Sequence, residues 1–137
     1  MRKILFTAIG LLSIVVITSG FTIFLQDDPK PWAVPDKNAK IANPVKSDDE
    51  SLKTGKEVWA KHCQSCHGKT GKGDGSKAAQ LKTAPGDFTK ADFHKQSDGA
   101  FYYKISEGRD DMPAFKKKIA DQDEIWAVVN YMRTFKK

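Results

Sequence analysis

The sequence predicts a small all-α domain, and two observations favour this fold class. After residue 50, apolar residues recur three and four positions apart, which is the period of a helix with one buried face. No stretch alternates apolar and polar residues as a half-buried strand does. The helical pattern covers residues 51–137, so we expect one domain with a limited hydrophobic core.

The first helix is expected to begin at Ser47-Asp48-Asp49-Glu50, because Ser47 and Glu50 have the spacing of a capping box. Gly55 lies inside this helix, although a glycine there costs about 1 kcal/mol relative to alanine. Close approach of another backbone would compensate that cost, and an ordinary surface glycine is the alternative. The apolar stripe of the helix is formed by Leu52, Val58, Trp59, Cys63 and Cys66.

A glycine-rich turn over residues 68–75 follows, and residues 76–81 are expected to form a short helix. The tripeptide Gly68-Lys69-Thr70 matches the last three residues of the phosphate-binding loop pattern. Such a loop requires a glycine five residues earlier, and that position holds Cys63. We therefore expect no nucleotide binding.

Two longer helices complete the predicted fold. One is capped by Ser97 or Asp98 and ends at Gly108, and the other starts at Asp121. Their apolar faces comprise Phe101, Tyr102 and Ile105 in the first, and Ile125, Val128, Val129, Met132 and Phe135 in the second. The aromatic residues expected in the core or in a pocket wall are Trp59, Phe101, Tyr102 and Trp126.

The two cysteines of the chain lie in Cys63-Gln64-Ser65-Cys66-His67, the C-x-x-C-H pattern of c-type haem attachment. On a helical turn, residues three and four apart share one face. Cys63 and Cys66 can therefore form thioethers with the two vinyl groups of one haem, while His67 gives an imidazole nitrogen to its iron. The motif occurs once, so we expect one haem c per chain.

Three other uses of these cysteines fit less well. A structural zinc site would need a second pair of ligands downstream, and the sequence has none. A redox dithiol of the thioredoxin type belongs in a βαβ setting, which the pattern does not show. A disulfide between Cys63 and Cys66 would close too small a loop to stabilise the chain much.

With its neighbouring motifs, the chain resembles the single-haem class I cytochromes c in their small bacterial form, from about Ser51 to Lys137. The matching pieces are GKEVW at 55–59, CQSCHG at 63–68, GKGDG at 71–75, GRDDMPAF at 108–115 and YMR at 131–133. The resemblance implies a small cytochrome c fold, with about four short helices packed around one covalently bound haem. It also implies that the first and last helices cross where Gly55 meets Val128 and Tyr131.

The sixth iron ligand in that family is a methionine in the loop before the last helix, usually followed by proline, and Met112 occupies this position. Without the family, the candidates are the soft thioether and imidazole donors. Met1 belongs to the leader, and Met132 lies in the apolar stripe of the last helix, where a core role is common. His62 should point elsewhere on its helix and His94 lies in a polar stretch, so both are weaker candidates.

Arg2 and Lys3 precede an apolar run of 22 residues, from Ile4 to Leu25. That length spans a bilayer as a helix and exceeds the usual apolar region of a cleaved signal, so we favour a signal anchor for residues 1–25. Cleavage of a signal peptide after Gly20 is the alternative. In both cases the rest of the chain is exported to the periplasmic side of the inner membrane, anchored or soluble.

Residues 26–50 are polar and hold four of the six prolines, which predicts an extended tether between the leader and the cytochrome c domain at 51–137. Trp32 and Val34 depart from this composition. Two interpretations are open: these side chains pack on the domain, or they lie at the membrane interface, where tryptophan is favoured.

Without Arg2 and Lys3, 21 basic residues stand against 17 acidic ones, a net charge of +4 before any haem. An acidic redox partner would be steered toward the haem edge by lysines near it, although a solvated basic turn is the plainer interpretation. The lysines concerned are Lys69, Lys72, Lys77, Lys116, Lys117 and Lys118. We expect no nucleic-acid binding, because the export signal and the lack of a matching motif argue against it.

These predictions indicate an electron carrier rather than an enzyme. One electron would pass between a donor and an acceptor protein, such as an oxidase or another respiratory complex, while His67 and Met112 both stay bound to iron. Two alternatives are open: a haem subunit of a larger membrane oxidoreductase, and a haem enzyme or gas sensor with a labile sixth ligand. For the latter, Arg109 is the nearest catalytic candidate, although a hydrogen bond to a propionate or within its loop is its more ordinary role.

Overall fold

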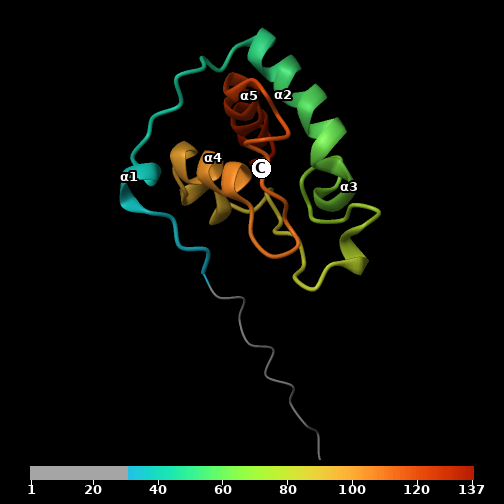
Figure 1. The fold of residues 1–137 in the computed structure, drawn as a ribbon. Helices are drawn as coiled ribbons and strands as arrows, with labels where there is room; N and C mark the ends of the chain where they lie inside the picture. The colour runs from blue at the N-terminus through green and yellow to red at the C-terminus, as the bar shows by residue number, and fades with distance from the viewer. Residues whose placement is uncertain (1–30) are drawn as a thin grey trace, which may run out of the picture.

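The computed structural model describes residues 31–137 and is built from short helices (Figure 1). The only β-type pairing among these residues is an isolated bridge between Arg109 and Met112. The all-α prediction is therefore confirmed. The elements in chain order are α1 (Asp36–Ala39), α2 (Asp49–His62), α3 (Gln64–His67), the 3₁₀ turns η1 (Ala78–Gln80) and η2 (Phe93–Lys95), α4 (Asp98–Glu107) and α5 (Gln122–Arg133).

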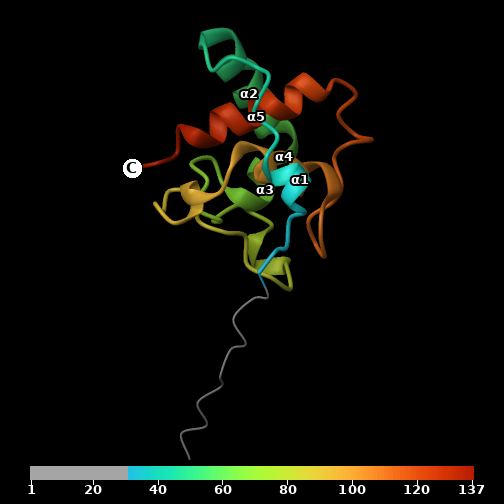
Figure 2. The same ribbon diagram turned by 90° about the vertical axis from the view of Figure 1, so that its left-hand side faces the viewer.

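Helices α2 and α5 cross closely, and Figure 2 shows α5 lying across α2. A Cβ atom at Gly55 would lie 2.1 Å from the carbonyl oxygen of Ala127 and 2.9 Å from Cβ of Tyr131. The predicted crossing at Gly55 is confirmed for Tyr131. The second contact is the Ala127 backbone rather than Val128, whose side chain is fully buried in the core.

The capping box of α2 lies one residue later than predicted. Asp48 is the N-cap, and its Oδ1 accepts a hydrogen bond of 3.0 Å from the Ser51 amide. The Asp48 amide in turn donates to Oγ of Ser51 at 3.2 Å. The predicted box of Ser47 and Glu50 is therefore wrong, because Asp48 caps as well as serine does and Ser51 supplies the return bond.

The other helix boundaries agree better with the sequence. Ser97 caps α4 through the Ala100 amide, Gly108 ends that helix, and Asp121 caps α5. The helix predicted over residues 76–81 is only the single turn η1. Capping side chains and glycine stops are local signals, which is why they locate these ends.

The aromatic residues assigned to the core are found there. Trp59, Phe101 and Trp126 are buried, and Tyr102 is half-buried with its ring stacked on Trp126 at a centroid distance of 4.1 Å. Nε1 of Trp59 donates to the carbonyl oxygen of Gly68 at 3.1 Å. This bond ties α2 to the glycine-rich turn after the C-x-x-C-H motif.

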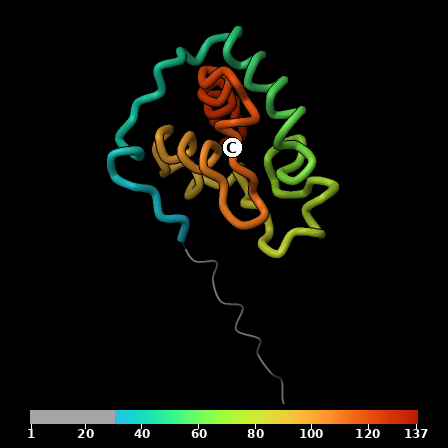
Figure 3. The backbone as a smooth tube through the Cα atoms, in the orientation of Figure 1, coloured from blue at the N-terminus to red at the C-terminus, as the bar shows by residue number. Residues whose placement is uncertain are grey.

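The segment before α2 differs from the extended tether that we predicted for residues 26–50. Its described part contains α1 and runs along the outside of α4 before it reaches α2 (Figures 1 and 3). Oγ of Ser97 donates to the carbonyl oxygen of Ala39 at 2.6 Å, and Nδ2 of Asn43 donates to Oδ1 of Asn130 at 2.9 Å. These partners on α4 and α5 hold a polar segment that composition alone suggests is free.

None of the helices in residues 31–137 combines the length and the apolar character needed to cross a membrane. The apolar run of residues 4–25, on which the signal-anchor prediction rests, lies outside the described residues. The assignment of residues 1–25 as a leader therefore stays a prediction.

Candidate functional site

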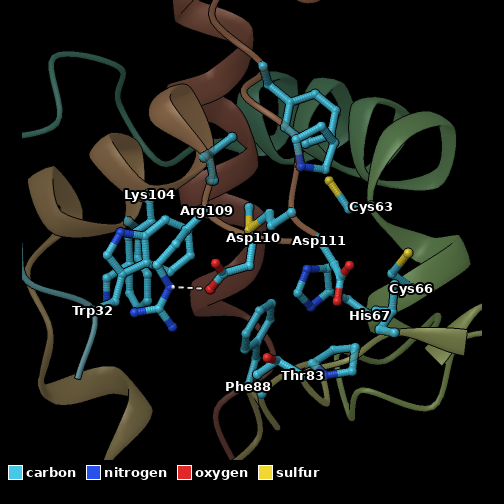
Figure 4. A pocket seen from close by; sticks show the side chains of 18 of the residues that line it. Trp32, Cys63, Cys66, His67, Thr83, Phe88, Lys104, Arg109, Asp110 and Asp111 are labelled. Atoms are coloured by element: carbon cyan, nitrogen blue, oxygen red, sulfur yellow. Dashed lines mark ion pairs between the residues drawn. The ribbon is translucent and has the colours of Figure 1, made fainter. Parts of the chain in front are cut away.

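The C-x-x-C-H motif begins where α2 ends and continues as the single turn α3. The carbonyl oxygen of Cys63 accepts hydrogen bonds from the amides of Cys66 at 3.1 Å and His67 at 2.9 Å. This turn places all three residues at one side of a cleft (Figure 4). The structure thus brings the two thiols and the imidazole together as the spacing predicts.

The cleft is partly open to solvent, and most of its lining is apolar. Its walls come from α3, the loop over residues 81–88, α4 and the turn over residues 109–113. The ring of Phe88 stacks on that of His67 with centroids 4.8 Å apart. An apolar cleft with a few converging polar groups is typical of a cofactor site.

Met112 enters the cleft from a tight turn after α4. The Arg109 amide donates to the Met112 carbonyl oxygen at 2.8 Å, and the Met112 amide donates back to Arg109 at 2.9 Å, across Asp110 and Asp111. Asp110 has a φ of 51°, a left-handed conformation that aspartate tolerates better than most residues. A Cβ atom at Gly108 would lie 2.5 Å from the Met112 carbonyl oxygen. The backbone at Met112 is therefore fixed from two sides.

Burial sets the protonation of the motif. It raises the pKa of the Cys63 thiol to about 12, and the nearby Cys66 thiol adds to this rise. A thiol with such a pKa is a poor nucleophile, which argues against the redox-dithiol alternative. Burial also lowers the pKa of His67 to about 4, so its imidazole is neutral at pH 7 and able to bind a metal.

These residues fit a covalently bound haem. Both cysteines are free, and both face the same apolar cleft as His67. Nδ1 of His67 is buried and has no hydrogen-bond partner among the described residues. A neutral, buried imidazole beside two thiols is the donor set that haem c requires.

Two more donor side chains line the cleft, in addition to Met112. Met132 reaches it from α5, where it is also part of the core, as predicted. His62 lines it as well, so the expectation that His62 points elsewhere is wrong. Because α2 ends at His62 and the chain turns at once into α3, neighbouring positions 62 and 63 both face the cleft. His94 does not line it, and its Nε2 lies 2.5 Å from the carbonyl oxygen of Phe88.

Among the lining residues that sequence reasoning did not assign to the site are Trp32 and Lys104. The Arg109 guanidinium lies over the Trp32 ring, 4.6 Å from its centre, and Nζ of Lys104 lies 5.7 Å from it. Burial, and secondly the charge of Arg109, lower the pKa of Lys104. The only indication of Trp32 in the sequence was a tryptophan in an otherwise polar segment. Of the two interpretations left open for it, the structure shows packing on the domain.

The lysines expected near the haem edge do not line the cleft. Lys116 forms an ion pair of 2.6 Å with Glu107, and Nζ of Lys118 lies 5.5 Å from the centre of the Phe115 ring. Their role in attracting a partner stays a prediction.

Comparison with known proteins gives a family and a fold. Residues 50–132 match the family described as cytochrome c oxidase, cbb3-type, subunit III. The solved Kuenenia stuttgartiensis reducing HAO-like protein complex Kustc0457/Kustc0458 has a similar fold, with a TM-score of 0.62 and 24% identity. That match covers 82% of this chain and 53% of the other, so this chain spans about half the length of that solved protein. The KustC0563 c-type cytochrome is 32% identical with a TM-score of 0.53, over 61% of this chain and 98% of the other. No curated protein matches.

Proposed function

Because this chain belongs to the family of cbb3-type cytochrome c oxidase subunit III, we propose that it carries single electrons with His67 and Met112 as the two axial iron ligands. The family and the c-type cytochrome among the similar structures give its cofactor as covalently bound haem c. Haem c supplies the exchange of one electron between the ferrous and ferric states of its iron. No bond of a substrate changes, so the chain acts as a carrier.

The observation that carries this proposal is the meeting of residues 63–67 with Met112 in one cleft. The thiols of Cys63 and Cys66 hold the cofactor covalently, so it does not dissociate when the iron changes charge. His67 offers a neutral imidazole, and Met112 offers a thioether, which favours the ferrous state relative to a second histidine. The apolar walls exclude water and disfavour the extra positive charge of the ferric state.

A second role, compatible with the first, is that of a haem subunit in a larger membrane oxidoreductase. The matching family is described as an oxidase subunit, and one similar fold comes from a protein complex. The predicted anchor at residues 1–25 would keep the domain on the periplasmic side of the inner membrane, next to such a complex. Copurification of other redox subunits with the full chain from detergent-solubilised membranes would support this role, and isolation of the chain alone would favour a free carrier.

The axial ligands are tested by optical spectra of the full chain, expressed with a c-haem maturation system. We expect a low-spin spectrum with a sulfur-to-iron charge-transfer band and no response to carbon monoxide. Met112→Leu should abolish the band, lower the midpoint potential and allow carbon monoxide to bind. Met132→Leu and His62→Asn are matched controls, because both residues line the same cleft.

The control variants also decide the alternatives. If Met132→Leu alone abolishes the band, Met132 is the ligand and the assignment of Met112 is wrong. Ready binding of carbon monoxide by the unchanged protein would instead indicate a haem enzyme or gas sensor with a labile sixth site.

A further inference from the structure

The cleft receives one side chain from outside the family-matched domain. The match begins at residue 50, whereas Trp32 lies 18 residues earlier and still lines the cleft. Figure 4 shows Trp32, Lys104 and Arg109 gathered at one side of the cleft, and Cys63, Cys66 and His67 at the other. The pre-domain segment therefore contributes to the site from the side opposite the thiols.

The position of Trp32 is defined by the chain that follows it. Pro31 and Pro35 flank it closely, and proline fixes its own φ and restricts the residue before it. Helix α1 starts directly after Pro35 and rests on α4, where a Cβ atom at Gly99 would lie 2.2 Å from the carbonyl oxygen of Asn38. Further along, Nδ2 of Asn43 donates to both Trp126 O and Asn130 Oδ1 on α5. The five residues from Pro31 to Pro35 therefore have a restricted backbone, and they connect the cleft to α1, which is held against α4.

The side of the cleft that holds Lys104 and Arg109 is positively charged, which suits the edge of a haem that carries its two carboxylate side chains. In the macrocycle, the two carboxylate side chains lie on the edge opposite the two vinyl groups. Thioethers at Cys63 and Cys66 would therefore direct the carboxylates toward Lys104 and Arg109. Two cations beside each other in a partly dry site are stabilised by an anion.

The acidic residues near these two cations, as far as the described residues show, pair with groups other than Lys104. Asp110 pairs with Nε of Arg109 at 3.4 Å, and its side chain is 67% exposed. Asp111 accepts a hydrogen bond of 2.7 Å from the Lys82 amide. The side chain of Lys104 donates to the neutral amide of Gln96, so no carboxylate of the described residues pairs with Lys104.

We propose that Trp32 is a haem-site residue that covers the carboxylate edge of haem c, where the cations of Arg109 and Lys104 hold its ring. The proposal rests on haem c in the cleft, as the proposed function does, and it is independent of which side chain is the sixth ligand. Trp32 is a positioning residue in this site: it excludes water from the cofactor edge and joins the pre-domain segment to the haem.

The first test uses the full chain with haem attached and compares Trp32→Ala with Ile41→Ala. Ile41 lies in the same segment, is 44% exposed and does not line the cleft. Trp32→Ala should lower the midpoint potential, because water at the haem edge stabilises the ferric state. It should also speed reduction by ascorbate several-fold, and Trp32→Phe should restore most of both properties. Equal potentials and rates in Trp32→Ala and Ile41→Ala would overturn the proposal.

The second test locates the indole directly and does not need a destabilising variant. The chain has three tryptophans, and the indole N–H signal that disappears in Trp32→Phe is that of Trp32. In the unchanged protein this signal should shift between the ferric and ferrous states, because the unpaired electron of ferric iron acts on nearby protons. An identical position in both states would overturn the proposal. The haem spectrum of the same samples reports the proposed function separately.

Discussion

Replacing Gly55 by alanine tests whether the close crossing of α2 and α5 holds this fold together. Two effects oppose each other. Alanine is the better helix former, which alone would stabilise α2 by about 1 kcal/mol. Its methyl group would however lie 2.1 Å from the Ala127 carbonyl oxygen and 2.7 Å from the carbonyl carbon.

The structure decides which effect is larger. Non-bonded atoms pack best at about 3.5 Å, so the helices must separate by about 1.4 Å at the crossing. The obstructing atoms belong to the backbone of α5 and cannot rotate away as a side chain would. Overpacking typically costs about 1–3 kcal/mol, and a backbone contact of 2.1 Å places this site at the upper end of that range. After the gain in helix propensity, a net loss of about 2 kcal/mol is left. For a domain of this size the melting temperature should fall by about 8–16 °C.

The measurement is a thermal melt of the haem-containing protein followed by far-ultraviolet circular dichroism. Lys56→Ala is the matched control, because it is an exposed neighbour in the same helix and should change stability by less than about 0.5 kcal/mol. A melting temperature of Gly55→Ala at or above that of the unchanged protein would show that helix propensity decides. The close approach would then not constrain the crossing.

Two further predictions concern the cleft. Gly108→Ala should keep the haem attached but weaken the sulfur-to-iron band and admit carbon monoxide. The reason is that φ is 65° at this position and the new methyl group would press on the Met112 backbone, at a cost of about 1–3 kcal/mol. Gly86→Ala is the control and should leave the band unchanged, because its methyl group would meet nothing closer than 3.5 Å. The full chain made without haem attachment should be poorly folded, because much of its small core is the wall of the cleft; a well-dispersed amide spectrum of this haem-free protein would contradict that expectation.

The sequence predicted those features that depend on neighbouring residues. Ser97, Asp121 and Gly108 locate helix ends by local hydrogen bonding or local φ, and the C-x-x-C-H spacing defines a turn that the structure contains. Gly55 was a subtler case, in which the cost of a glycine inside a helix indicated a close neighbour before that neighbour was known. Of its two predicted partners, Tyr131 was correct and Val128 was one residue away from the observed Ala127, because a helix–helix crossing depends on the fit of two surfaces.

The features that the sequence did not predict arise from contacts between distant segments. The segment before α2 has the composition of a free tether, yet Asn43 and Ala39 find partners on α5 and α4. Trp32 and Lys104 are 72 positions apart and meet only through this docking. The sequence does not show which distant group will form a hydrogen bond with a polar residue. A polar composition therefore suggests a segment exposed to solvent, even where it packs on the domain.

The two halves of the proposed iron site are fixed by different kinds of contact. His67 takes its position from α3, which continues α2 directly, and α2 in turn rests on α5 at Gly55. Met112 takes its position from a backbone turn that is closed by Arg109 and supported by Gly108. A carrier that exchanges one electron gains from ligands on such rigid supports, because neither has to move when the iron changes charge. The expected loss of the sulfur-to-iron band in Gly108→Ala, set against a loss of stability in Gly55→Ala, would separate these two supports experimentally.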